Sequence, residues 1–189
     1  GVSLRSAAEV FAALDRALFE PYIVVVNGAT WSTQQGQVVD KNDFSIHLGA
    51  VKFDYALIMI HGTPGENGLL QGYFQMMKIP FSSCNTEVSA LTFNKSLCKK
   101  SIADIWGVNL AKEIPIRKGE MIDPQRYISE LGLPFFVKPN ASGSSFGVSK
   151  VKGVEQIENA IQVAMNESNT VLLEEYIQGV EVSQGIMII

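Results

Sequence analysis

The segment His61–Gly68 groups residues that could bind a small ligand. It reads His-Gly-Thr-Pro-Gly-Glu-Asn-Gly and follows the apolar run 55–60. An apolar run that ends at a Gly/Pro-rich segment is typical of a buried parallel strand, and ligands of open α/β sheets bind beyond the carboxyl ends of such strands. Glycines let backbone approach a ligand closely, so the imidazole and the carboxylate suggest a binding loop. A tight strand-to-helix turn with an incidental histidine is the alternative.

A second candidate is the segment 140–147, Asn-Ala-Ser-Gly-Ser-Ser-Phe-Gly, which lies between two expected strands. Its backbone N–H groups and hydroxyls could wrap an anion such as a phosphate. Lys138, at the end of the preceding strand, would add a point charge. Most short Gly/Ser loops are simply hairpins, so the pairing of this loop with Lys138 is the more specific signal.

The segment Leu172–Ile177 is an expected strand that ends in two acids and an aromatic residue, and Gly179 and Glu181 follow it. It could give an adenine ring an apolar slot and main-chain partners, and it could give a ribose a carboxylate acceptor. An edge strand with solvated acids explains the same residues as well.

Three lysines lie in the helix expected at 95–105. Lys95 stands at the helix start, where a cation gains nothing from the helix dipole. Taken alone, Lys95 is interpreted as a solvated lysine, and Lys99 and Lys100 are interpreted in the same way.

The elements that would position these groups fall into two halves. In the first half, a helix from Leu4 capped by Ser3, a strand at 22–26, the strand at 55–60 and a helix at 69–77 favour an α/β domain with a parallel sheet. The second half holds expected strands at 111–117, 134–138, 148–151, 170–176 and 181–189 and helices at 124–131 and 154–165. Hairpins with helices on one side favour an α+β domain, and Asp123 before Pro124 predicts a helix start.

Composition limits the classes of partner. The chain has 189 residues and a net charge of -4. Because it has no basic field, nucleic acid is not an expected partner, and no segment is long and apolar enough to predict a membrane span. Cys84 and Cys98 lack metal-ligand spacing and are expected to be reduced thiols in a cytosolic protein.

Taken together, the motifs have a characteristic order. From the N-terminus they are H-G-x-x-G-E-x-G, Q-G-Y-F near I-P-F, F-N-K, L-P-F-F-V-K-P, G-S-S-F-G-V-S-K-V and L-L-E-E-Y-I-x-G-x-E. The series resembles the D-alanine–D-alanine ligases of the ATP-grasp superfamily, over essentially the whole chain from Val2. Asn67 stands where the family pattern has an aspartate, which leaves the role of that side chain open.

The resemblance implies a role for each motif. It assigns nucleotide phosphates to Lys95 and Lys138, which reverses the interpretation of Lys95 as solvated. For the rest of the nucleotide site it implies the loop residue Ser145, the adenine-framing residues Glu174, Glu175, Tyr176 and Ile177, and the ribose carboxylate Glu181. For the first D-alanine it implies His61, Val2 and the catalytic Ser144, which would belong to a hydrogen-bonded group at that site.

The resemblance also implies the domain organisation. Residues 1–92 would form an N-terminal D-alanine-binding α/β domain, 93–173 the central ATP-grasp subdomain and 174–189 the start of the C-terminal ATP-grasp subdomain. The family's first strand and glycine-rich turn would precede Gly1, and its metal ligands and lid loop would come after Ile189. We therefore expect a fragment trimmed at both ends, with no metal ligand of its own and no activity alone.

The activity implied for the complete protein is the ATP-dependent ligation of two D-alanines through an acyl phosphate, for peptidoglycan precursor synthesis. ATP with Mg²⁺ or Mn²⁺ is the implied cofactor set, D-alanine the substrate, a homodimer the expected assembly and the cytoplasm the expected location. Residues that govern the second substrate would lie in the lid loop, so D-alanine–D-lactate and D-alanine–D-serine ligases remain alternatives. A non-catalytic ATP-grasp binding module is a third alternative, although such a module would be expected to lose the phosphate lysines.

Overall fold

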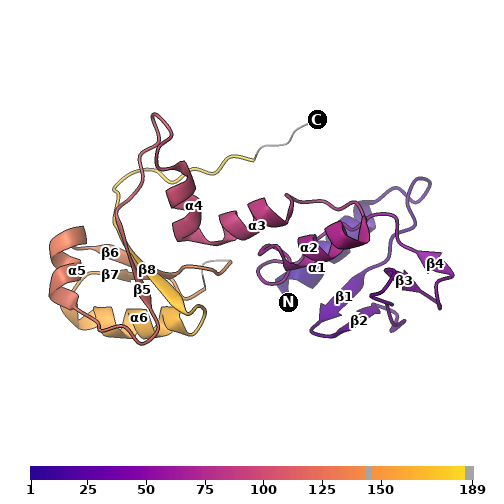
Figure 1. Cartoon of the computed structure of the whole chain (residues 1–189), viewed down its shortest axis with the longest axis horizontal. Coiled ribbons are helices and arrows are strands. Elements are labelled where there is room, and N and C mark those ends of the chain that lie inside the picture. Colours follow the sequence, from indigo (N-terminus) through magenta and orange to yellow (C-terminus); the bar gives the residue numbers. More distant parts are fainter. Residues whose placement is uncertain (144–145, 186–189) are drawn as a thin grey trace. The chain divides into compact units, whose positions relative to one another are not determined.

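The computed structural model describes residues 1–143 and 146–185, so Ser144, Ser145 and residues 186–189 lie outside the described part. The chain divides into two compact units, Gly1–Lys95 (unit 1) and Ser96–Ile189 (unit 2). Figure 1 shows the helices and strands of each unit. The three-part division expected from the sequence, with boundaries after residues 92 and 173, stays a prediction.

Unit 1 combines helices with two small antiparallel sheets. Its elements are α1 (Val2–Ala13), β1 (Val24–Asn27), β2 (Thr30–Thr33), β3 (Ser45–Ile46), β4 (Val51–Lys52), α2 (Leu69–Met77) and α3 (Thr86–Phe93). β1 pairs with β2, and β3 pairs with β4. The helix expected at 69–77 is confirmed as α2, whereas α3 is not among the predicted elements.

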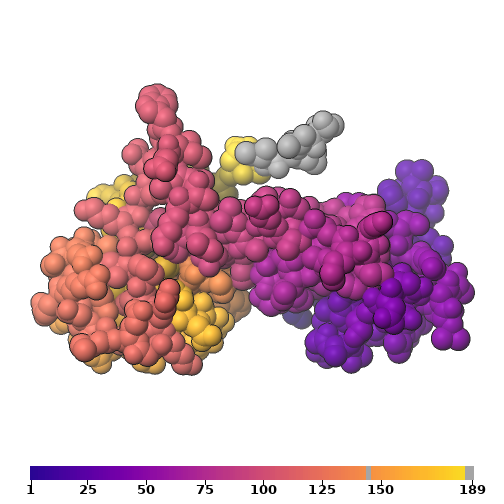
Figure 2. Space-filling model, in the orientation of Figure 1, coloured from indigo at the N-terminus to yellow at the C-terminus, as the bar shows by residue number. Residues whose placement is uncertain are grey.

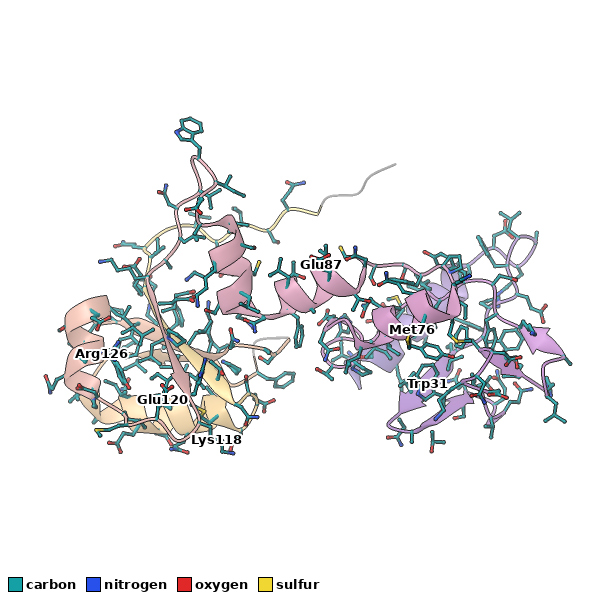
Figure 3. The ribbon with its side chains drawn as sticks, in the orientation of Figure 1. Trp31, Met76, Glu87, Lys118, Glu120 and Arg126 are labelled. Carbon is teal, nitrogen blue, oxygen red and sulfur yellow. The ribbon has the colours of Figure 1, made fainter. Side chains whose placement is uncertain are left out.

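Aromatic side chains build the core of unit 1. Trp31 on β2, Phe44 and Phe74 on α2 are each at most 8% exposed. The rings of Trp31 and Tyr73 meet edge to face with centroids 5.0 Å apart, and those of Phe44 and Phe74 do the same at 5.0 Å. Such pairs contribute about 0.5–1.5 kcal/mol each beyond the burial of their area. Trp31 is labelled among the side chains of this unit in Figure 3.

The parallel sheet expected in unit 1 is not present among the described residues, where every sheet is antiparallel. The segment 55–60 forms one isolated parallel bridge, between Ala56 and Phe81. Two residues after Ala56, the Ile58 N–H donates to the Ser82 side-chain hydroxyl at 2.9 Å and not to the backbone of a neighbouring strand. Leu57 is 45% exposed. The interpretation of 55–60 as a buried parallel strand is therefore wrong for this structure, because a strand needs backbone partners along its length.

The loop after residue 60 is packed tightly against α2. A Cβ on Gly65 would lie 2.1 Å from the Ile60 carbonyl oxygen. Gly68, with φ at +91°, is the N-cap residue of α2 and has the left-handed conformation that favours glycine. The buried Gln71 side chain donates to the Gly65 carbonyl at 2.6 Å and to the Ser83 hydroxyl at 3.1 Å. Glycines and one buried amide thus fix the path of the loop.

Unit 2 is a four-stranded antiparallel sheet with helices. Its elements are α4 (Lys95–Ile102, which begins at the last residue of unit 1), β5 (Glu113–Arg117), α5 (Pro124–Leu131), β6 (Phe135–Pro139), β7 (Ser149–Val151), the short 3₁₀ helix η1 (Val154–Gln156), α6 (Ile157–Met165) and β8 (Thr170–Glu175). The strand order is β5-β8-β6-β7. The strands expected before residue 177 are confirmed within about two residues. No strand forms at 181–185, and 186–189 lie outside the described residues.

One face of this sheet carries the apolar core. Phe135 and Val137 on β6 and Leu173 on β8 are fully buried, and they pack with Ile161 on α6 and Tyr127 on α5. α5 begins as expected, because the Asp123 carboxylate accepts from the Arg126 N–H at 3.1 Å with proline at the first position. Since alternate strand residues point to opposite faces, the residues between these apolar ones must lie on the other face.

The segment 103–112, between α4 and β5, projects from unit 2 in Figure 2. Trp106 in this segment is 98% exposed. The segment therefore adds little to the core, which is formed by the sheet, α5 and α6.

Gly65→Ala should destabilise unit 1, because the new Cβ cannot avoid the Ile60 carbonyl unless the loop moves. Overpacking of this kind costs about 1–3 kcal/mol, and urea denaturation should show a loss of that size in the free energy of unfolding. Gly72→Ala on α2 is the matched control, since its Cβ would make an ordinary contact 3.6 Å from Thr86 Oγ1. Equal stability of the two variants would show that the loop accommodates a side chain.

Candidate nucleotide and substrate sites

A row of charged and aromatic side chains crosses the sheet of unit 2 on the face opposite α5 and α6. Glu113 on β5 pairs with Glu174 on β8, Glu174 pairs with Phe136 on β6, and Phe136 pairs with Lys150 on β7. Directly paired residues lie on the same face of a sheet. Lys138 comes two residues after Phe136 on β6 and therefore lies on that face too.

Glu174 is shared by two lysines. Its Oε1 accepts from Lys138 Nζ at 2.5 Å, and its Oε2 accepts from Lys99 Nζ at 3.0 Å. Lys99 Nζ also lies 2.9 Å from Glu113 Oε2 and donates to the Ala111 carbonyl at 2.6 Å. The four charged side chains are between 13% and 21% exposed, so solvent screens their ion pairs much less than it screens pairs at the surface.

The position of Lys99 corrects the interpretation of this residue as solvated. Lys99 lies one helical turn after Ser96, so both face the sheet from α4. The Ser96 hydroxyl donates to Glu113 Oε1 at 2.6 Å, and the Ser96 backbone N–H donates to Asn140 Oδ1 at 3.0 Å. The spacing of Ser96 and Lys99 is the sequence signal that could have identified this side of the helix. Lys100 is exposed, as expected.

The ion pairs set the charge states of the network. Burial alone would raise the pKa of Glu174, but the hydrogen bonds and charges of Lys138 and Lys99 outweigh it and hold this pKa below its ordinary value. Burial alone would lower the pKa of Lys99, but the hydrogen bonds and charges of Glu113 and Glu174 outweigh it, so this pKa lies above its ordinary value. Glu174 and Lys99 are therefore both charged at neutral pH.

Tyr176, directly after β8, extends the row as an aromatic surface. Lys150 Nζ lies 3.5 Å from the centroid of the Tyr176 ring, a cation–π contact, and 5.7 Å from that of Phe136. The two ring centroids are 6.0 Å apart. Tyr176 is 39% exposed and Ile177 is 63% exposed, so an apolar surface beside the ionic network is open to a ligand.

The remaining residues expected at a nucleotide site lie near β8 or α4. The Glu175 N–H donates to the Lys112 carbonyl at 3.1 Å, and its carboxylate accepts from the Lys112 N–H at 2.7 Å. Glu181 is exposed, and Lys95 is half-buried at the first position of α4. Ser144 and Ser145 lie outside the described residues. The structure brings Lys138, Glu174 and Tyr176 into one region of unit 2, and the nucleotide roles of all these residues stay predictions.

A second group of polar side chains lies in unit 1, where α1 contacts the loop that begins at His61. The His61 N–H donates to Ser3 Oγ at 3.1 Å, and His61 Nε2 lies 3.4 Å from Ser6 Oγ. The expected capping of α1 by Ser3 is wrong, because Gly1 is the N-cap and the Ser3 hydroxyl is bonded to the loop. Val2, next to Ser3, is 60% exposed. Val2 and His61 are therefore near one another along this contact, and their role in binding stays a prediction.

Glu66 and Asn67 hold the same loop from within. Glu66 Oε2 accepts from the Gly62 N–H at 2.7 Å, and Glu66 Oε1 lies 3.9 Å from His61 Nδ1. Asn67 Oδ1 accepts from the Leu69 N–H at 3.3 Å. Aspartate could accept the same bond, but the Asn67 amide also donates to the Thr63 hydroxyl at 3.1 Å, which an aspartate carboxylate could not do.

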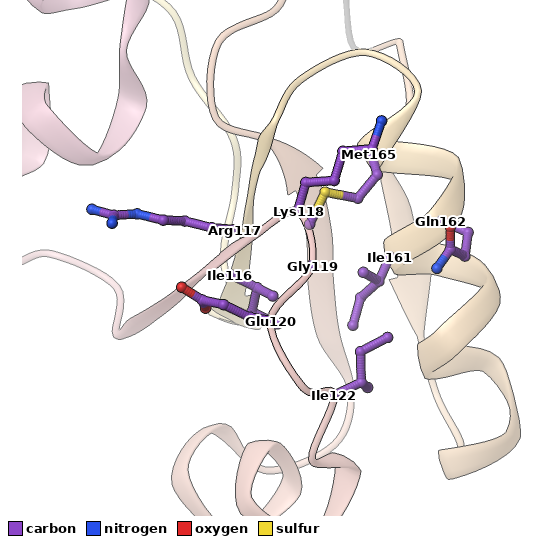
Figure 4. A pocket seen from close by; sticks show the side chains of 9 residues that line it. All are labelled: Ile116, Arg117, Lys118, Gly119, Glu120, Ile122, Ile161, Gln162 and Met165. Atoms are coloured by element: carbon purple, nitrogen blue, oxygen red, sulfur yellow. The ribbon is translucent and has the colours of Figure 1, made fainter.

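Two pockets of the described part of the chain contain none of the predicted site residues. The first has a volume of about 70 Å³ and lies between the segment after β5 and α6, where Ile116, Lys118, Ile161 and Met165 are among its lining residues (Figure 4). The second lies in unit 1 beside residues 38–48. A pocket of 70 Å³ is too small for a nucleotide, since sites for organic ligands measure about 300–1,000 Å³.

The described residues contain neither a metal-ligating cluster nor a membrane-spanning helix. Among residues 1–143 and 146–185, no three His, Cys, Asp or Glu side chains are grouped so that they could hold a metal ion. In the same part of the chain, no helix combines the length and the apolar character needed to cross a bilayer.

Known proteins with similar sequences and folds are ligases. A family model described as D-ala D-ala ligase C-terminus matches residues 103–188. A D-alanine–D-alanine ligase of Phocaeicola vulgatus is 45% identical over 190 residues, which cover 97% of this chain and 58% of that protein. The structure of D-alanyl-alanine synthetase A from Vibrio cholerae aligns with a TM-score of 0.81 at 28% identity, over 94% of this chain and 55% of that one.

The names of two more similar structures mention a substrate or a bound nucleotide. VanG D-Ala:D-Ser ligase from Enterococcus faecalis aligns with a TM-score of 0.79 at 26% identity, over 94% of this chain and 59% of that one. D-alanine–D-alanine ligase from Bacillus anthracis complexed with ATP aligns with a TM-score of 0.71 at 27% identity, over 94% and 55%.

The chain spans a little over half the length of the relatives that it matches. The chain has the mixed α/β fold of these ligases. Over nearly its whole length the chain is similar to D-alanine–D-alanine ligases, and residues 103–188 match the model of their C-terminal part.

Glu174→Gln should remove a pH-dependent part of the stability. Because the Glu174 pKa is lowered by folding, its stabilising contribution is present above the ordinary value of 4.5 and is lost as the pH falls through the folded-state pKa. The free energy of unfolding of the wild type should exceed that of the variant by about 1–3 kcal/mol at neutral pH. The two should converge as the pH falls below the folded-state pKa of Glu174.

Urea denaturation at several pH values measures this difference. Glu120→Gln is the matched control, because Glu120 is exposed in the segment after β5 and its substitution should change little at any pH. A wild-type advantage over Glu174→Gln that stays constant down to low pH would contradict the lowered pKa.

Proposed function

We propose that the full-length protein joins two D-alanines in an ATP-dependent reaction that supplies a peptidoglycan precursor. The observation that carries this proposal is the Lys138 ammonium, held by Glu174 on the sheet face opposite α5 and α6 and followed by the Gly/Ser-rich segment 140–147, in a chain similar to D-alanine–D-alanine ligases. An ammonium beside backbone N–H groups and hydroxyls is suited to bind phosphate oxygens.

The nucleotide is assigned to unit 2 and Lys95. Lys138, Lys95 and Ser145 would bind its phosphates, and Glu181 would accept hydrogen bonds from the ribose. The segment 174–177 would frame the adenine, where the partly exposed Tyr176 ring offers a flat apolar surface.

The proposed reaction has two steps. The carboxylate of the first D-alanine attacks the γ-phosphate of ATP, which gives D-alanyl phosphate and ADP. The amine of the second D-alanine then attacks the acyl carbon, and phosphate leaves. Phosphoryl transfer of this kind is accelerated mainly by positioning and by neutralising charge, and the lysine ammonium groups serve both purposes.

The first D-alanine is assigned to Val2, His61 and Ser144. The His61 imidazole would donate a hydrogen bond to the substrate carboxylate. Ser144 would belong to the hydrogen-bonded group that positions the substrate, and Val2 would line the site with its side chain.

Mg²⁺ or Mn²⁺ completes the proposed cofactor set, and a bound divalent ion would neutralise phosphate charge. Because the described residues contain no cluster of metal-ligating side chains, no step is assigned to a metal held by this part of the chain.

We further propose that the full-length protein is a homodimer in the cytoplasm. We also propose that it has three folded parts, which begin at residues 1, 93 and 174; the third would include residues after Ile189. Residues outside this chain would complete a parallel sheet around the segment 55–60.

The assay of purified full-length protein tests the function. Release of phosphate from ATP should require D-alanine, and chromatography should identify D-alanyl-D-alanine as the product. D-Serine and D-lactate are tested as second substrates, since the fold similarity extends to a D-Ala:D-Ser ligase. A preference for either compound would mean that this compound, and not D-alanine, is the second substrate. ATP turnover without formation of any dipeptide or depsipeptide would overturn the proposal.

Lys138→Ala in the full-length protein should raise the KM for ATP and lower kcat, because a charged partner of the phosphates is lost. Hydrogen bonds to charged groups are worth about 1.5–3 kcal/mol, or about ten- to a hundredfold in kcat/KM. Lys100→Ala, which removes an exposed lysine from α4, is the matched control and should behave as the wild type. Kinetics of Lys138→Ala that match those of the control at low ATP would remove Lys138 from the site.

A further inference from the structure

The ammonium groups of the ionic network in unit 2 differ in how they are bound. Lys99 Nζ is surrounded by three oxygens, those of the Ala111 carbonyl, Glu113 and Glu174. Lys138 Nζ forms its ion pair with the other oxygen of Glu174. Lys99 Nζ is therefore enclosed by protein oxygens, with two of its three donors in hydrogen bonds to the Ala111 carbonyl and Glu174 and with Glu113 Oε2 2.9 Å away. Any phosphate that binds Lys138 must instead compete with Glu174 Oε1.

The charges of the four side chains in the network balance one another. The two carboxylates, Glu113 and Glu174, are neutralised by the two ammonium groups of Lys99 and Lys138, and all four side chains are at most 21% exposed. When Lys138 turns to a phosphate, Lys99 is the cation that stays with both carboxylates. Without Lys99 the same movement would leave two partly buried carboxylates unpaired, which is costly in a low-dielectric setting.

We propose that Lys99 is a positioning residue for nucleotide phosphate binding: it keeps Glu113 and Glu174 paired, so that Lys138 can exchange Glu174 Oε1 for a phosphate oxygen. The inference rests on the proposed ATP-dependent function and names a residue outside the predicted site. Lys99 acts through Glu174 and Lys138 and does not touch the nucleotide. Its effect should therefore be larger on ATP than on adenosine, because adenosine has no phosphate and meets only the adenine-framing segment to which Glu174 belongs.

The test compares five variants of the full-length protein: Lys99→Met, Lys99→Arg, Lys100→Met, Glu113→Gln and Lys99→Met/Glu113→Gln. Calorimetric titration with ATP and with adenosine separates phosphate binding from nucleoside binding, and steady-state kinetics at saturating D-alanine give the KM for ATP and kcat. Lys100→Met is the matched control, because it removes the same charge from the neighbouring, exposed position of α4.

Lys99→Met should weaken ATP binding at least about tenfold, since an opposite charge at this distance shifts a charge equilibrium by about 1–3 powers of ten. Adenosine affinity should fall less than ATP affinity, because adenosine has no phosphate for Lys138 to bind. Lys99→Arg should restore most of the ATP affinity because it keeps the charge. The double variant should recover part of it, because the loss of the Glu113 charge leaves one carboxylate fewer to neutralise.

Equal ATP affinities of Lys99→Met and Lys100→Met would overturn the inference. So would a parallel loss of ATP and adenosine binding, because a residue that merely braces α4 would affect both. If Lys99→Met does not fold, the double variant is compared with Glu113→Gln alone, and equal ATP affinity of these two overturns the inference. Failure of the wild type to bind ATP would overturn the proposed function as well. If the wild type ligates normally and Lys99→Met binds ATP as the wild type does, only the role of Lys99 is overturned.

Discussion

The charged face of unit 2 depends on the way in which Glu174 is shared. One carboxylate binds the ammonium of Lys138 from β6 and that of Lys99 from α4. Removing one partner of a buried ion pair can cost up to about 3–5 kcal/mol, because the other charge is left without compensation. Glu174 therefore fixes a strand lysine and a helix lysine at once. Through Lys99 and Ser96, both of which contact Glu113, the same group of charges attaches α4 to the sheet.

The sheet tolerates these charges because its other face supplies the apolar core. Phe135, Val137 and Leu173 are fully buried against the helices, and the residues that alternate with them, Lys138 and Glu174 among them, lie on the opposite face. A slip of one residue in the register would exchange the two faces and place Lys138 in the core. Burial of apolar side chains thus fixes the register, and the register decides where the lysine assigned to phosphate lies.

The parts of this arrangement that depend on local signals could be predicted from the sequence. Asp123 before Pro124 marks the start of α5, and the expected strands of unit 2 as far as β8 lie at the predicted positions. The contacts of Lys99 could not be predicted, because Glu113 and Glu174 are brought to it only by the pairing of β5 with β8. The prediction for the segment 55–60 failed for a related reason. An apolar run shows that a segment will be covered, but it does not identify the strand that supplies its backbone partners.

The loop that begins at His61 shows how the two interpretations of such a segment can both hold. Gly65 packs on Ile60, and Glu66 bonds to the Gly62 N–H, so the loop is a tight turn. The same turn leaves the His61 imidazole exposed, with Nε2 3.4 Å from Ser6 Oγ of α1, while the His61 backbone N–H donates to the Ser3 hydroxyl. A polar group that is already held in place loses less conformational entropy when a ligand binds than one on a mobile loop. The tightness of this turn, which alone would suggest a purely structural role, is therefore compatible with the proposed role of His61 in binding the first D-alanine.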